Sequence, residues 1–106
     1  LIKTTVKNYL SYISKSNIKY QHNIIIQGVP CPNIDTKKHL EKDVKELIEV
    51  ISIFNLELSS QAKERGFGFL DVHKLTDRGD GLSSGIWHID DIHLSPDGFL
   101  EAWSMM

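Results

Sequence analysis

The residue types best suited to chemistry are an aspartate and a histidine near the C-terminus, Asp90 and His93, which stand three positions apart. A tight turn of this length brings a carboxylate beside one ring nitrogen of an imidazole and leaves the other nitrogen free to act as a base. Enzymes that activate a hydroxyl nucleophile use a base oriented by an acid in this way. The spacing therefore predicts an acid–base pair.

The residues that follow extend this pattern, because Leu94-Ser95-Pro96-Asp97-Gly98 comes directly after His93. An Asp-x-x-His followed by a short turn into a final helix resembles the last conserved block of the SGNH/GDSL hydrolases. The resemblance implies that Asp90 is the triad acid and His93 the general base. It also implies an ester or related acyl substrate, such as an acetyl or short acyl group on a carbohydrate or small molecule, and a three-layer, flavodoxin-like α/β sheet.

The nucleophile of that family is a serine in a Gly-Asp-Ser motif, and a glycine and an asparagine from two further blocks complete its oxyanion hole. Neither Gly-Asp-Ser nor Gly-x-Asn-Asp occurs in the 106 residues. We therefore expect residues 1–106 to be a single domain or the C-terminal part of an SGNH hydrolase domain, with the serine supplied from outside this segment. The alternative is a non-catalytic binding or dimerising module with a degenerate hydrolase fold.

Two other kinds of site could include His93. His88, Asp90, Asp91 and His93 are suitable ligands for zinc or another divalent ion, which would make a metal-dependent hydrolase, although their spacing is not that of His-Glu-x-x-His. Cys31 could act as a thiol nucleophile with His93, but a buried structural cysteine between two prolines is the favoured interpretation. We expect neither a metal nor a cofactor.

A Gly-x-Ser-x-Gly pattern occurs at residues 81–85, with Ser83 at its centre. A nucleophile elbow needs a buried strand before the serine and a helix after it. The preceding residues 77–80 are instead Asp-Arg-Gly-Asp. We therefore interpret this stretch as a flexible, glycine-rich loop.

The elements that must position these residues follow from hydrophobic periodicity and from capping residues. An N-cap at Asp35 or Thr36 and a C-terminal cap at Gly66 bound a long helix, and Ser95-Pro96-Asp97 opens the last one. In total the sequence predicts three helices, over residues 2–17, 36–65 and 96–106, and two strands, over 24–29 and 67–72.

A strand, a long helix and a second strand in this order favour two parallel strands. Parallel sheets are normally covered on both faces and rarely stop at two strands. We therefore expect further strands from another segment, or a homodimer that completes the sheet.

The composition is that of a soluble globular protein, with 41% hydrophobic and 25% charged residues. A net charge of −2 offers no attraction for nucleic acid or an anionic membrane, and no apolar run approaches the ~20 residues of a membrane span. The single cysteine rules out an internal disulfide and fits a reducing compartment, so we expect a cytoplasmic location.

Overall fold

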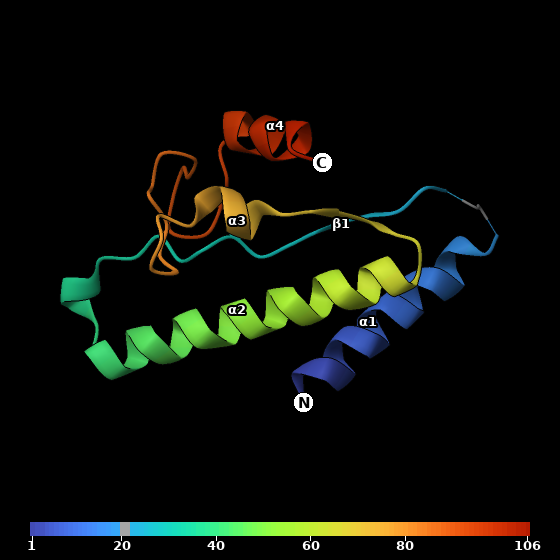
Figure 1. The fold of residues 1–106 in the computed structure, drawn as a ribbon, viewed down its shortest axis with the longest axis horizontal. Coiled ribbons are helices and arrows are strands. Elements are labelled where there is room, and N and C mark those ends of the chain that lie inside the picture. Colours follow the sequence, from blue (N-terminus) through green and yellow to red (C-terminus); the bar gives the residue numbers. More distant parts are fainter. Residues whose placement is uncertain (20–21) are drawn as a thin grey trace.

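The fold is mixed α/β in a computed structural model that describes residues 1–19 and 22–106 (Figure 1). The elements in chain order are α1 (Ile2–Asn17), β1 (Ile25–Gln27), the 3₁₀ turn η1 (Thr36–Lys38), α2 (Glu41–Glu64), β2 (Gly68–Leu70), α3 (Val72–Thr76) and α4 (Pro96–Ser104). The two strands and the three longer helices overlap the ranges that periodicity predicts, although both strands, α2 and α4 are shorter than predicted.

The sheet consists of β1 and β2, which pair in parallel with Ile26 opposite Phe69. Two further bonds lengthen the ladder, from the Gly68 amide to the Ile24 carbonyl (2.9 Å) and from the Gly28 amide to the Leu70 carbonyl (3.0 Å). The predicted parallel pairing is confirmed. Within the described residues, no strand pairs with the other edge of β1.

Helices cover this small sheet on both sides, with α1 and α2 on one side of the strands and α4 on the other (Figure 1). One core cluster joins α1, α2 and β1 through Val6, Leu10, Ile26, Leu58 and Ala62. A second cluster joins β2, α3 and α4 through Leu70, Val72 and Ala102. None of the helices in the described part of the chain combines the length and apolar character needed to cross a membrane.

The long helix begins later than the sequence predicts. The Asp35 carboxylate accepts a hydrogen bond from the Lys37 amide (3.0 Å) and so caps the single turn η1 rather than α2, which starts at Glu41. The predicted C-terminal end is confirmed, because Gly66 lies just past α2 with a φ of 74°. Glycine takes this left-handed conformation without a steric cost.

The prediction of three helices was wrong, since the described residues form four α-helices. The second strand ends at Leu70, and the Asp71 carboxylate accepts a hydrogen bond from the Lys74 amide (2.9 Å). Asp71 thereby caps α3, a five-residue helix in a stretch too short to show helical periodicity.

A buried asparagine on α2 fixes the end of β1. The Asn55 Oδ1 accepts a hydrogen bond from the Val29 amide (2.8 Å), and Nδ2 donates to the Val29 carbonyl (2.9 Å). The neighbouring Gly28 has no room for a side chain, because a Cβ there would lie 2.6 Å from the Asn55 Oδ1. The end of β1 and α2 therefore approach closely, with the Asn55 side chain packed against backbone atoms of Gly28 and Val29.

We expect Asn55→Ala to lower the free energy of unfolding by about 1–3 kcal/mol, because it leaves the Val29 amide and carbonyl without these partners. Urea denaturation measures the change. Ser60→Ala, at an exposed position on the same helix, is the control and should stay within about 0.5 kcal/mol of wild type. Equal stability of both variants would contradict the role assigned to Asn55.

Candidate active site

The candidate site lies on the loop that leads into α4. Two hydrogen bonds join the arms of this loop, from the Ile89 amide to the His93 carbonyl (3.0 Å) and from the Ser95 amide to the Trp87 carbonyl (2.7 Å). Ser95 then caps α4, as predicted, by accepting a hydrogen bond from the Gly98 amide (3.1 Å). The tip of the loop, residues 90–92, is therefore held between a short antiparallel pairing and a helix start.

Asp90 and His93 are in direct contact at this tip. The Asp90 Oδ2 lies 2.7 Å from the His93 Nδ1, while Oδ1 accepts hydrogen bonds from the Ile92 amide (2.8 Å) and the His93 amide (2.6 Å). Both side chains are open to solvent, 51% exposed for Asp90 and 69% for His93. The turn thus brings the acid to the base as the three-residue spacing predicts.

The backbone amides make Asp90 a stronger acid. Their hydrogen bonds, from His93 and then Ile92, together with the imidazole contact, lower the pKa of Asp90 to about 2. The carboxylate is therefore charged at neutral pH. A charged carboxylate on Nδ1 favours the tautomer with the proton on that nitrogen, which leaves Nε2 to accept a proton.

Asn33, in the segment that follows β1, holds the tip of the loop in place by two hydrogen bonds. The Asn33 Nδ2 donates a hydrogen bond to the Asp90 carbonyl (3.1 Å), and the Asn33 amide donates to the Asp91 carbonyl (3.4 Å). Sequence reasoning missed Asn33. The only available signal was a polar residue just after the Pro-Cys-Pro stretch that ends the first strand.

Ser83 and His88 form a second pair that the sequence did not reveal. The Ser83 Oγ lies 2.7 Å from the His88 Nδ1 and accepts a hydrogen bond from the Gly85 amide (2.9 Å). Ser83 is only 6% exposed, and burial lowers the pKa of His88. Through these contacts Ser83 holds the loop together, and it is not an accessible nucleophile. It also lacks the preceding strand and the following helix that a nucleophile elbow requires.

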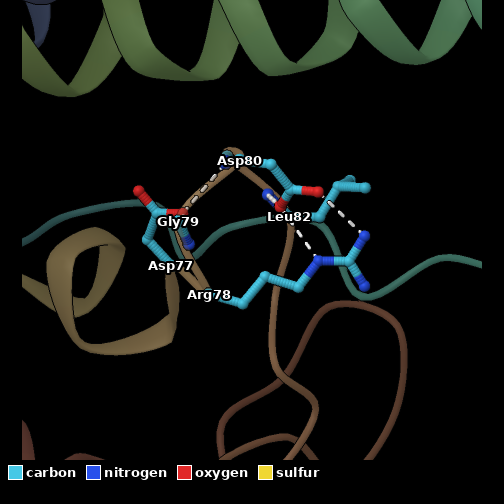
Figure 2. Close-up of polar contacts among 6 residues, drawn as sticks. Asp77, Arg78, Gly79, Asp80 and Leu82 are labelled. Carbon is cyan, nitrogen blue, oxygen red and sulfur yellow. Dashed lines mark hydrogen bonds and ion pairs between the residues drawn. The ribbon is translucent and has the colours of Figure 1, made fainter.

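The glycine-rich stretch before Ser83 is a loop, as predicted, but it is closely hydrogen-bonded (Figure 2). The Asp77 Oδ1 accepts hydrogen bonds from the amides of Gly79 (2.8 Å) and Gly81 (2.9 Å). The Arg78 guanidinium meets both carboxylate oxygens of Asp80 at 2.9 Å. In this turn each of the charged side chains Asp77, Arg78 and Asp80 thus has a hydrogen-bonding partner.

Cys31 is buried, with 1% of its surface exposed, as the structural interpretation predicts. Burial raises the pKa of its thiol to about 11. The Cys31 amide donates to the Thr76 Oγ1 (2.8 Å), and the thiol lies within hydrogen-bonding distance of the His73 carbonyl (3.4 Å). Because the thiolate is the reactive form, this residue is a packing group rather than a nucleophile.

The four residues considered as metal ligands do not converge on one point. His88 turns its Nδ1 to Ser83, whereas Asp90 and His93 bind each other. Among residues 1–19 and 22–106, no group of three or more His, Cys, Asp or Glu side chains is arranged to hold a metal ion.

Comparisons with protein-family models, with curated proteins and with solved structures found no match for this chain. The fold and the site define it as a mixed α/β protein with a two-stranded parallel sheet and an exposed Asp–His pair before the last helix.

We expect Asp90→Asn to reduce the loss of stability between about pH 4 and pH 2. The folded pKa of Asp90 is depressed, so its contribution is complete above the ordinary aspartate value near 4 and disappears as the pH falls through about 2. Urea denaturation across this range, with Asp91→Asn as the control, measures the difference. Identical pH profiles for wild type and Asp90→Asn would contradict the hydrogen bonding described here.

We expect the Cys31 thiol to resist a disulfide reagent such as DTNB at pH 8 in the folded protein, because burial keeps it protonated and out of reach. The same thiol should react fully in denaturant. A cysteine introduced by Ser84→Cys, at an exposed position, should react at once and serves as the control. Equal labelling rates for the two thiols in folded protein would refute the assignment.

Proposed function

We propose that this chain supplies the acid and the base of an SGNH/GDSL-type ester or acyl hydrolase. The observation that carries the proposal is the 2.7 Å contact between Asp90 and the His93 Nδ1, with the second carboxylate oxygen held by two backbone amides. This arrangement orients the imidazole by one nitrogen and presents the other to solvent. The helix that starts at Pro96 directly after the pair agrees with the resemblance.

In the proposed reaction the His93 Nε2 takes the proton from a serine hydroxyl as the serine oxygen attacks the acyl carbon. The same nitrogen then returns that proton to the leaving alcohol. Water repeats the cycle on the acyl-enzyme and releases the acid. Asp90 keeps the imidazole in the required tautomer and stabilises its positive charge in both halves of the reaction.

The nucleophile is proposed to come from outside residues 1–106. Ser83 is buried and bonded to His88, which leaves it unsuited to attack a substrate. Within the described residues no strand pairs with the far edge of β1, which supports an external origin, because a parallel sheet of two strands has room for more strands on that side. Strands added there from another segment would extend the pair toward the three-layer, flavodoxin-like sheet of the family and carry the serine. A second copy of residues 1–106 could extend the sheet but would not supply that serine.

We expect the full-length protein to hydrolyse p-nitrophenyl acetate and His93→Ala to abolish this activity. Asp90→Asn should lower kcat by about 10⁴-fold, because the imidazole then prefers the wrong tautomer. His39→Ala, at an exposed position far along the chain from the pair, is the control and should keep the wild-type rate. A His93→Ala protein with undiminished activity would overturn the proposal.

A further inference from the structure

His88 lies at the base of the loop that leads into α4 (the site loop, residues 86–95) and joins this loop to its neighbours. It pairs with Leu94 in a single antiparallel bridge, so it adjoins the turn that carries the acid and the base. Its Nδ1 lies 2.7 Å from the Ser83 Oγ, and the Ser83 amide donates a hydrogen bond to the Pro32 carbonyl (2.8 Å). The imidazole therefore connects the site loop to the glycine-rich loop and, through Ser83, to the segment that follows β1.

The other ring nitrogen of His88 is buried from solvent. Among residues 1–19 and 22–106, the His88 Nε2 has no hydrogen-bond partner. A neutral ring that donates from Nδ1 to the Ser83 Oγ leaves Nε2 as a bare acceptor. Protonation would place a second N–H at this buried position without an acceptor, which costs more free energy than an unused lone pair. The closed loop therefore accommodates a neutral His88 and disfavours a charged one.

Among the described residues, Asp90 is the charged group that acts on the His88 ring. Its negative charge favours a proton on the imidazole, but its carboxylate is already in contact with His93 and with two backbone amides of the turn. Burial outweighs this attraction and lowers the pKa of His88.

The charged groups of the adjoining elements have other partners. On the glycine-rich loop, the Asp77 carboxylate accepts hydrogen bonds from two backbone amides, and Arg78 pairs with Asp80. Asp97 lies in the first turn of α4, where a negative charge interacts favourably with the helix dipole. Residues 29–34 contain no acidic or basic side chain. These elements therefore provide no free carboxylate to hold a charged His88 in place.

We propose that His88 is a pH-sensitive latch on the acid–base turn: the neutral ring holds the site loop closed against Ser83, and protonation releases the loop. In the open loop the ring regains its ordinary pKa of about 6.5. Because the pKa in the closed loop is lower, the stability that His88 contributes is complete above about pH 7 and falls as the pH drops below about 6.5. The latch goes beyond the proposed hydrolase, because it controls the position of the turn whatever reaction the turn performs.

Amide hydrogen exchange, measured by NMR at about pH 7.5 and about pH 5.5, tests the latch directly in this chain. The reporters are the Ile89 and Ser95 amides, whose hydrogen bonds join the two arms of the site loop. After correction for the intrinsic effect of pH on exchange, we expect their protection to fall about tenfold at the lower pH. One unit below a pKa of about 6.5, proton uptake favours the open loop by about this factor. The Leu58 amide, in the α1–α2 core, should keep its protection. Unchanged protection of Ile89 and Ser95 would overturn the proposal.

Substitution of single histidines identifies the group that titrates. His88→Asn keeps a polar side chain beside Ser83 but cannot take up a proton, so the protection of Ile89 and Ser95 should be the same at both pH values. His39→Asn, at an exposed position between η1 and α2, is the matched control and should keep the tenfold response. A response that survives in His88→Asn would assign the pH dependence to another group and refute the latch.

Titration of the wild-type ring is a second measurement, which decides the question if His88→Asn does not fold. The NMR midpoint of the His88 ring should lie below the ordinary value of about 6.5, and a midpoint at or above that value would overturn the proposal. Neither measurement uses an ester or a serine, so the latch and the proposed function are tested separately. His93-dependent hydrolysis with pH-independent exchange would refute the latch and leave the hydrolase. A pH-dependent loop in a full-length protein that hydrolyses no ester would refute the hydrolase and leave the latch.

Discussion

The hydrogen bonds between the Asn55 side chain and the backbone of Val29 determine where the chain leaves the sheet. One buried amide satisfies both the donor and the acceptor of Val29, immediately before Pro30, which has no amide hydrogen to continue a strand. Without these two hydrogen bonds, the half-buried amide and carbonyl of Val29 would need water or another protein group as a partner. The position of the segment that follows Val29 would then not be fixed relative to α2.

That segment connects the parts of the molecule that make up the site. Its backbone binds α3 through the Cys31 amide and the Thr76 hydroxyl, and the glycine-rich loop through the Pro32 carbonyl and the Ser83 amide (2.8 Å). Asn33 then reaches the site loop at Asp90. Polar contacts to backbone groups thus help to set the position of the exposed Asp90–His93 turn.

Local signals in the sequence predicted much of the fold. The apolar stripe of α2, the positive-φ Gly66 after it and the Ser95 cap of α4 each depend on residues within a few positions of one another. The Asp90–His93 contact is local in the same sense, which is why the spacing alone predicted it. The predicted start of α2 was wrong because two N-cap positions, Asp35 for η1 and Leu40 for α2, lie close together.

The supports of the site could not be predicted, because they join residues far apart in sequence. Asn55 looks like an interruption in an apolar stripe until Val29 is placed against it. In the sequence, Ser83 is only the centre of a weak Gly-x-Ser-x-Gly pattern, and nothing there indicates its contact with His88. Hydrophobic periodicity contains no information about such pairs, and the number of strands in a sheet is likewise a tertiary property.

The sequence separation of these supports has a consequence for how the site assembles. The acid–base turn closes over three residues, but its anchors close over 26 residues at Val29, 45 at Cys31 and 57 at Asn33. Loop-closure entropy delays contacts of this kind until the intervening chain is already ordered. We therefore expect the turn to form early in folding and to dock against the 29–34 segment late. We expect local opening of that segment to release the acid–base turn while the α1–α2 core stays folded.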